Sequence, residues 1–219
     1  IPKCASTSLK LALHQAEFGD PYESRTLSTG LGRKDHIHRF MKRTFEKDIA
    51  LAKFRFVVVR DPVDRFLSAY ANRVLDHHEL SEAKAPLLGA SQGFIFNPGL
   101  GQFLEHLDTY IQVKSIEWHL RMVNQHLPYG LSNFTKIYKI NETAEIERDL
   151  SKMYDQAVCL PRTQVAKAKV SVKQLNSAQL DQVIEFCRED YKLLSSFFTI
   201  DEVWKRWKSP DLPHPPPQT

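Results

Sequence analysis

The chain has 219 residues, of which 42% are hydrophobic and 26% are charged, a composition typical of one folded domain that excludes a disordered chain. Its longest apolar runs fall far short of the ~20 residues that a membrane-spanning helix needs, so no transmembrane segment is expected. The formal net charge of +4 suits an anionic partner without requiring one.

The N-terminal residues predict an anion-binding site at the start of a helix. Residues 8–16 carry apolar side chains at the spacing of an amphipathic helix. The preceding Ile-Pro-Lys-Cys-Ala-Ser-Thr-Ser segment, residues 1–8, supplies a lysine and hydroxyl groups where free backbone N–H groups attract phosphate. It lacks the glycines and the lysine spacing of a Walker A loop. We expect a strand before Ile1, in residues upstream of this sequence.

The clearest strand-to-helix junction lies at Arg60. Residues 54–59 form a run of β-branched and aromatic residues that is typical of a buried strand. Asp61 is a suitable N-cap, Pro62 suits the first helical position, and the apolar face of residues 63–74 predicts a helix. Arg60 therefore lies where open α/β sheets bind ligands. The alternative is a surface salt bridge to a neighbouring aspartate.

The rest of the chain continues the alternation of strands and helices. We expect a long loop at residues 89–101, helices at 100–107 and 116–127, a strand at 135–140, a helix capped by Thr143, a basic irregular stretch at 158–172 and a helix at 176–194. The fold class predicted from this order is α/β, with a parallel sheet flanked by helices. We expect a single domain at residues 1–208 and a Pro-rich tail at 209–219.

Two motifs resemble those of a known enzyme family. Residues 1–9, Ile-Pro-Lys-Cys-Ala-Ser-Thr-Ser-Leu, are similar to the 5′-phosphosulfate-binding loop of sulfotransferases. Residues 59–70, Val-Arg-Asp-Pro-Val-Asp-Arg-Phe-Leu-Ser-Ala-Tyr, are similar to their 3′-phosphate-binding motif. Weaker similarity continues at residues 117–119, 136–143 and 160–191. The resemblance is closest to Golgi-type carbohydrate sulfotransferases, especially the heparan sulfate and uronyl 2-O-sulfotransferase group and its bacterial relatives.

The resemblance implies a P-loop-like fold and transfer of a sulfuryl group from 3′-phosphoadenosine 5′-phosphosulfate to an acceptor hydroxyl, with a carbohydrate as the expected acceptor. Lys3 would stabilise the leaving oxygen, a role that needs no metal. Cys4 is expected to be a small side chain without thiol chemistry. The donor-binding residues implied are Pro2, Lys3, Cys4, Ala5, Ser6, Thr7, Ser8, Arg60 and Ser68. The positive charge of Arg162 and Lys167 makes them further candidates for contact with the nucleotide, the alternative being a solvated basic loop that departs from the family pattern.

Four residues are candidates for the acceptor side of the reaction. An acceptor hydroxyl needs a general base, and imidazole titrates near neutrality. The resemblance assigns His38 as the base and His36 as its neighbour in the acceptor site, the alternative being that both are exposed loop residues. Trp118 and His119 would line the acceptor cleft, although an aromatic at helical spacing is more often part of the core.

Other interpretations remain open at this stage. A P-loop-type kinase would need a Mg²⁺-binding carboxylate and a correctly spaced lysine. A nonenzymatic module that binds glycan or nucleic acid would need only the basic stretches, whereas the sulfotransferase hypothesis expects no nucleic-acid partner. The three cysteines lack zinc-site spacing and allow one disulfide. The preferred location of the protein is a bacterial cytoplasm. N-glycosylation sequons at Asn133 and Asn141 leave the Golgi lumen as the alternative location, with a membrane anchor upstream of this sequence.

Overall fold

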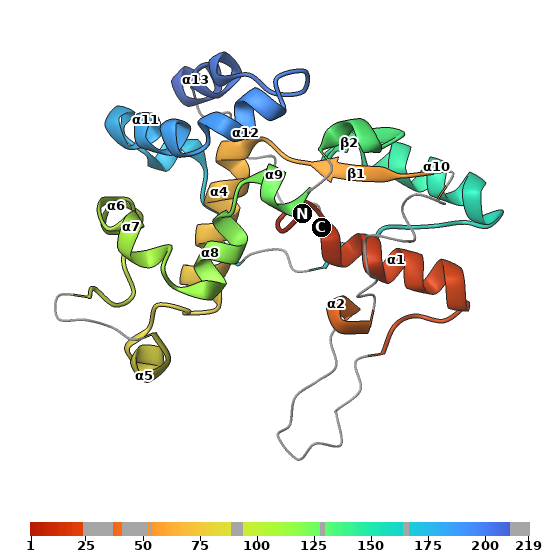
Figure 1. The fold of residues 1–219 in the computed structure, drawn as a ribbon, viewed down its shortest axis with the longest axis horizontal. Coiled ribbons are helices and arrows are strands. Elements are labelled where there is room, and N and C mark those ends of the chain that lie inside the picture. Colours follow the sequence, from red (N-terminus) through yellow and green to blue (C-terminus); the bar gives the residue numbers. More distant parts are fainter. Residues whose placement is uncertain are drawn as a thin grey trace.

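The computed structural model describes residues 1–23, 37–40, 52, 54–88, 94–127, 130–163 and 167–210. Short helices predominate in these ranges, and two strands lie among them (Figure 1). The strands are β1 (Phe56–Val59) and β2 (Lys136–Lys139). The α-helices are α1 (Ser6–Phe18), α2 (Ile37–Phe40), α4 (Pro62–Tyr70), α5 (Ala85–Leu88), α6 (Leu100–Glu105), α7 (Leu107–Tyr110), α8 (Lys114–Leu120), α9 (Val123–His126), α10 (Thr143–Tyr154), α11 (Ser177–Phe186), α12 (Arg188–Leu193) and α13 (Ile200–Lys208).

Tighter and wider helical turns complete the list of elements. Within the described ranges, three 3-10 turns lie at η2 (Glu82–Lys84), η3 (Leu131–Asn133) and η4 (Val172–Gln174). One π-helical segment, η1 (Ala71–Asp76), continues α4 without a break, since Ala71 keeps right-handed helical angles. π-Helical turns are rare and frequently occur at functional sites. This segment is therefore relevant to the site described below.

The two strands form a parallel pair in which Phe56 lies opposite Lys136 and Val59 lies opposite Lys139. Both strands were predicted from sequence, at residues 54–59 and 135–140. Parallel strands need a long crossover, and here helices from α4 to α9 supply it. The structure thus confirms the α/β class, with a small parallel sheet in the described residues. The P-loop-like topology stays a prediction.

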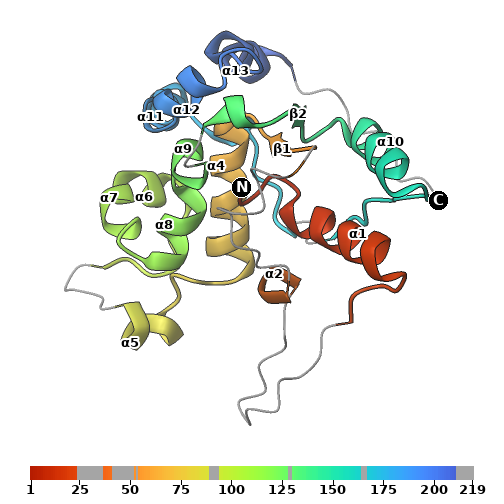
Figure 2. The same cartoon turned by 45° about the vertical axis from the view of Figure 1, so that its right-hand side comes forward.

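Helices cover both faces of the sheet. Successive side chains of a strand point to opposite faces, so each strand contributes apolar residues to both. On one face Val58 and Tyr138 pack with residues of α1 and α10. On the other face Val57 and Val59 pack with residues of α9 and α12. Figure 2 shows α1 and α10 on one side of the strands and α9 with α12 on the other. The sheet is therefore the middle of three layers.

The largest apolar cluster surrounds α4, which begins directly after the β1 end (Figure 2). Asp61 occupies its N-cap and accepts a hydrogen bond from the backbone N–H of Asp64 at 3.1 Å, and Pro62 opens the helix, as predicted. Val63, Phe66 and other apolar residues of this helix are almost fully buried. Burying each such large side chain contributes about 1.5–3 kcal/mol. This packing fixes where Arg60 leaves the sheet.

The prediction of one continuous helix over residues 116–127 is wrong. The structure ends α8 at Leu120 and starts α9 at Val123, because side chains bind the intervening backbone groups. The buried guanidinium of Arg65 donates to the carbonyl oxygens of residues 119, 120 and 121 at 2.9–3.4 Å. Asp190 accepts from the Val123 N–H at 2.7 Å. These bonds replace the helical ones that the break removes.

Three further boundaries differ from the predictions. The long helix expected over residues 176–194 is divided at Cys187 into α11 and α12, although Asn176 caps it as predicted. The helix expected over residues 100–107 ends at Glu105, and a separate turn, α7, follows. Thr143 is the first residue of α10, and Glu142 takes the cap position. The apolar face of α11 and α12 is buried as expected.

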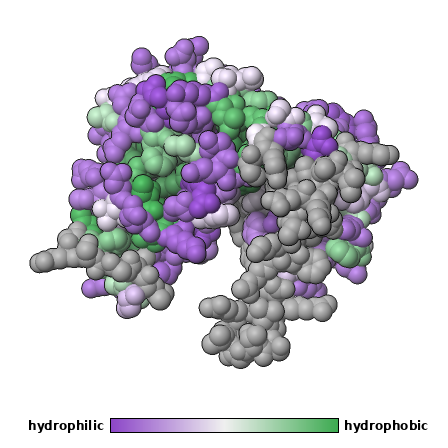
Figure 3. All heavy atoms as spheres, viewed as in Figure 1, coloured by the Kyte–Doolittle hydropathy of each residue, from purple (hydrophilic) through white to green (hydrophobic). Residues whose placement is uncertain are grey.

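The described surface is mainly hydrophilic. On the face shown in Figure 3, hydrophobic residues lie in patches between purple hydrophilic ones. Among the residues that the structure describes, the large hydrophobic side chains that are exposed are Phe18, Trp118 and Met153. Of the described helices, none has the length and apolar character that crossing a membrane requires.

Candidate functional site

The loop before α1 has a backbone conformation that L-residues seldom adopt. Lys3 has a φ of 65° and Ala5 a φ of 56°, both in the left-handed region without a glycine. Such strain is characteristic of ligand-binding turns. Ala5 occupies the N-cap of α1 and has no side-chain acceptor, and the first turn holds no acidic residue. The first turn of α1 therefore lacks a side-chain cap and a carboxylate, an arrangement that suits an external anion.

Positive charge converges on this loop. Burial lowers the pKa of Lys3 from 10.5 to about 8, with further lowering by the nearby cations of Arg73 and Arg60. The Arg60 guanidinium reaches the carbonyl oxygen of Lys3 at 3.5 Å. The alternative salt bridge of Arg60 is not found among the described residues, because Asp61 and Asp64 both pair with Arg206. Lys3 and Arg60 were both predicted to bind the donor and are 57 residues apart in the sequence. The structure brings them into contact.

Arg73 joins this site and was missed by the sequence analysis. It lies in the π-helical segment η1, where burial lowers its pKa and Glu79 opposes the effect. Its Nε atom is buried without a hydrogen-bond partner among the described residues. The one signal in the sequence was a basic residue beside Tyr70 and Val74, on a face that is otherwise apolar. A buried, unpartnered guanidinium nitrogen fits an anionic ligand.

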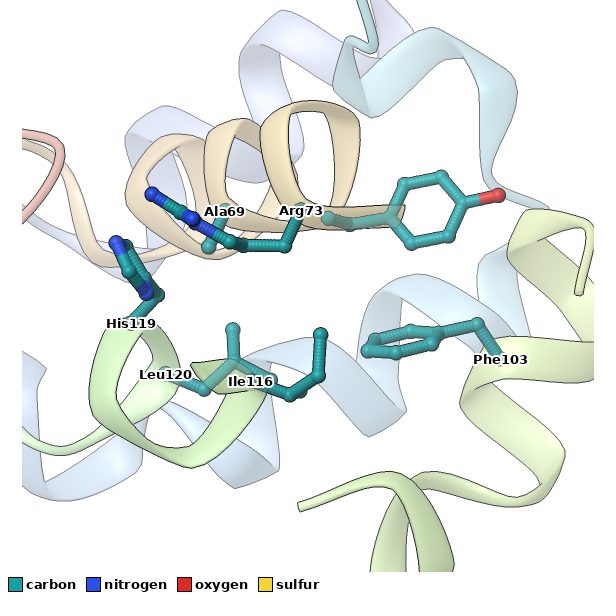
Figure 4. Close-up of a pocket in the computed structure, with 7 residues that line it drawn as sticks. Ala69, Arg73, Phe103, Ile116, His119 and Leu120 are labelled. Carbon is teal, nitrogen blue, oxygen red and sulfur yellow. The ribbon is translucent and has the colours of Figure 1, made fainter. Parts of the chain in front are cut away.

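A small pocket beside Arg73 is a packing gap. Figure 4 shows the nitrogen atoms of Arg73 and His119 at one end of it and the ring of Phe103 at the other. The gap encloses no space as large as a water molecule. It therefore cannot hold a substrate, and its polar end matters only as part of the cationic site around Lys3.

His38, a residue of α2, lies beside the first turn of α1. Its Nε2 atom is 2.9 Å from the Oγ1 atom of Thr7, a hydrogen bond between residues 31 apart. Ile37 beside it is buried, which anchors α2 against α1. The histidine predicted as the base therefore contacts the predicted donor loop. His36 lies outside the described residues.

The other predicted donor residues lie on several segments, of which the one carrying Arg162 is tied to α1. The hydroxyl of Ser8 is 3.3 Å from that of Thr163, which brings the exposed Arg162 close to α1. The backbone N–H of Lys167 donates to Asp76 at 3.1 Å, at the end of η1, while the residue itself is exposed. Ser68 is half-buried on α4. Pro2 and Ser6 flank Lys3 and Ala5 in the loop and the first turn.

Trp118 and His119 differ in their surroundings. Trp118 is 48% exposed, so the alternative that it is a core residue is wrong; the Arg121 guanidinium lies 4.8 Å from its ring centre. His119 bonds through Nδ1 to the carbonyl oxygen of Ser115 at 2.7 Å. Burial lowers the pKa of His119 to about 4, and Arg73 and Lys3 add to the effect. His119 is therefore neutral at pH 7, with its Nδ1 proton donated to Ser115.

The cysteines contribute no reactive thiol to the site. All three are free, which rules out the disulfide that the sequence allowed. Cys4 is 2% exposed within the cluster of α1 and β1, and burial raises the pKa of its thiol. Its side chain thus points into the core, and only its backbone is available to a ligand. Among the described residues there is no group of three metal-binding side chains.

Comparison with known proteins assigns the family. The model of the sulfotransferase family matches residues 1–196. The chain belongs to the sulfotransferase family. No curated protein and no solved structure gives a significant match. The matched region of this sulfotransferase includes Lys3, His38, Arg60 and Arg73 and ends before α13. Family membership supports an enzyme that transfers a sulfuryl group.

Proposed function

We propose that this sulfotransferase transfers the sulfuryl group of 3′-phosphoadenosine 5′-phosphosulfate to a hydroxyl group of a carbohydrate. One observation carries the proposal: the charges of Lys3, Arg60 and Arg73 converge at the start of α1. Cations that repel one another in a partly buried site favour an anionic ligand, because the ligand offsets their repulsion. A donor with a phosphate at each end of its ribose provides such charges.

The residues present fit this donor. The strained loop and the first turn of α1 present backbone N–H groups and the hydroxyls of Ser6, Thr7 and Ser8, which suit the 5′-phosphate. The planar guanidinium of Arg60 and the hydroxyl of Ser68 suit the 3′-phosphate. Arg162 and Lys167 lie on segments tied to Ser8 and Asp76 and add positive charge.

The chemistry asks mainly for positioning and charge stabilisation. The bound donor supplies an activated sulfuryl group. Lys3 stabilises the negative charge that develops on the phosphate oxygen as its bond to sulfur breaks. His38 takes the proton of the acceptor hydroxyl as the new oxygen–sulfur bond forms. When His38 donates its Nε2 proton to Thr7, Nδ1 is the nitrogen that bears the lone pair.

The carbohydrate acceptor is supported by the exposed Trp118. Trp118 precedes His119 on α8, and the His119 side chain lies at the Arg73 end of the packing gap (Figure 4). A flat aromatic surface offers the apolar face that sugar rings bury, and the neighbouring polar groups offer hydrogen bonds to hydroxyls. His36 is proposed as a further acceptor-site residue because it precedes His38 by two positions.

The direct test is transfer of radiolabelled sulfate. The purified protein would be incubated with the labelled donor and a panel of desulfated glycosaminoglycans, neutral oligosaccharides, a tyrosine peptide and a simple phenol. We expect label on a carbohydrate, with transfer at least ~100-fold slower in Lys3→Ala and His38→Ala. The control variant is His106→Ala, because His106 is exposed and remote from α1 in the sequence.

Two outcomes would contradict parts of the proposal. Unchanged transfer in the Lys3 and His38 variants, with the fold retained by circular dichroism, would refute the assigned roles. Label on the peptide or phenol alone would refute the carbohydrate acceptor and leave the donor assignment standing.

A further inference from the structure

The C-terminal helix α13 contacts the helix that follows Arg60. Its Arg206 side chain lies 2.6 Å from the Asp64 carboxylate through Nη1 and 3.2 Å from the Asp61 carboxylate through Nη2. One guanidinium therefore bridges two acidic residues of the α4 N-terminus. α13 lies beyond residue 196, where the family match ends, so this contact is not a feature of the matched region.

The carboxylate of Asp61 is tightly held. Its Oδ1 atom accepts from the Asp64 N–H and from the Tyr191 hydroxyl, each at 3.1 Å. Its side chain is only 9% exposed, and burial, with the nearby Asp64 charge, raises the pKa of Asp61. Arg206 opposes that shift and favours the charged carboxylate. Arg206 thus helps to keep the N-cap of α4 ionised.

The two carboxylates are unfavourable neighbours for an anion. Asp61 directly follows Arg60, and Asp64 lies one helical turn further along α4. Negative charge at these positions disfavours a phosphate bound by Arg60, and burial of Asp61 reduces the screening of its charge by water. A cation that bridges both carboxylates offsets this repulsion and leaves the Arg60 charge available to the ligand.

We propose that Arg206 is a positioning residue of the donor site, which neutralises Asp61 and Asp64 so that Arg60 binds the 3′-phosphate of the nucleotide. The inference rests on the proposed function, because it assumes that a 3′-phosphate is bound at Arg60. It assigns to α13 a part in donor selection. Arg206 acts through the aspartates and not by contact with the reacting atoms.

The test compares two nucleotides by calorimetric titration. Adenosine 3′,5′-bisphosphate carries the 3′-phosphate, and adenosine 5′-monophosphate lacks it. In Arg206→Gln we expect the affinity for the bisphosphate to fall about fivefold, because one charge that is partly screened by solvent is lost. The affinity for the monophosphate should stay the same. Removing the charge of the half-buried Asp64 as well, in Arg206→Gln with Asp64→Asn, should restore most of the affinity.

A second variant makes the test independent of the folding of Arg206→Gln. Asp64→Asn alone removes negative charge and leaves the Asp64 backbone N–H bond to Asp61 in place. If Arg206 acts by neutralisation, this variant binds the bisphosphate as tightly as the parent or tighter. If the bridge is only a structural tie, breaking it weakens binding of both nucleotides to the same extent.

The outcomes separate the two proposals. A parent protein that distinguishes the nucleotides, with no selective loss in Arg206→Gln or no recovery in the double variant, overturns the role of Arg206 and leaves the proposed function intact. A parent protein that does not prefer the bisphosphate overturns both. Selective loss followed by recovery supports both.

Discussion

At the scale of single residues, Lys3 is defined by its surroundings. Burial and two neighbouring guanidinium groups lower its pKa to about 8, so near neutral pH the protein holds a lysine that loses its proton easily. An anion bound beside Lys3 favours the charged form and raises the pKa again. Ligand binding and proton uptake are therefore coupled at this residue.

We predict that binding of adenosine 3′,5′-bisphosphate at pH 8 takes up about half a proton, because Lys3 is then about half deprotonated without ligand and becomes protonated with it. The effect grows as the pH rises through 8 and vanishes near pH 6, where Lys3 is already charged. Calorimetry in buffers of different ionisation enthalpy measures the uptake.

Lys3→Met provides the comparison for this prediction, and Lys152→Met, on the exposed face of α10, provides the matched control. The Lys3 variant should lose the uptake and the control should keep it. Equal uptake in all three proteins would mean that another group titrates.

At the scale of elements, the pair formed by Arg65 and Asp190 sets how helices meet. Their side chains are 3% exposed and 2.9 Å apart, and together they bind four backbone groups between His119 and Val123. This hub ends α8, places His119 and joins α4 to α12. Sequence periodicity cannot reveal it, because Arg65 and Asp190 are 125 residues apart.

Asp190→Asn should destabilise the fold by about 3–5 kcal/mol, because it leaves the buried Arg65 charge without its counter-ion. Urea denaturation followed by circular dichroism measures the change. The control is Glu189→Gln, whose exposed pair with Lys192 should cost less than ~1 kcal/mol. If the free energy of unfolding fell by less than ~1 kcal/mol in both variants, the pair of Arg65 and Asp190 would not stabilise the fold.

At the scale of the whole molecule, local patterns predicted the elements and the structure determined how they meet. The run of β-branched residues before Arg60, the Asp61 cap and Pro62 were enough to predict β1 and α4, because each signal acts within a few residues. The convergence of Arg73 on Lys3, and of Arg206 on Asp61, depends on tertiary packing between distant segments. A single sequence does not show which of these distant residues meet.

Global stability should fall in mild acid, in part through His126. Burial lowers the pKa of His126 from 6.5 to about 4, so the folded protein binds this proton less readily than the unfolded chain. Its stabilising effect is complete above pH 6.5 and is lost as the pH falls toward 4. Between pH 7 and 4.5 the melting temperature of His126→Gln should fall less than that of the parent. Parallel curves would refute the assignment.

The most direct measurement for the whole account is calorimetric titration of the parent and Arg60→Ala with adenosine 3′,5′-bisphosphate, ATP and adenosine 5′-monophosphate. The matched control is Arg188→Ala, whose exposed guanidinium pairs only with Glu185 among the described residues. We predict that the parent and the control bind the bisphosphate selectively and that Arg60→Ala loses this selectivity. Equal binding of ATP and the bisphosphate, or selectivity that survives in Arg60→Ala, would contradict the donor site described here.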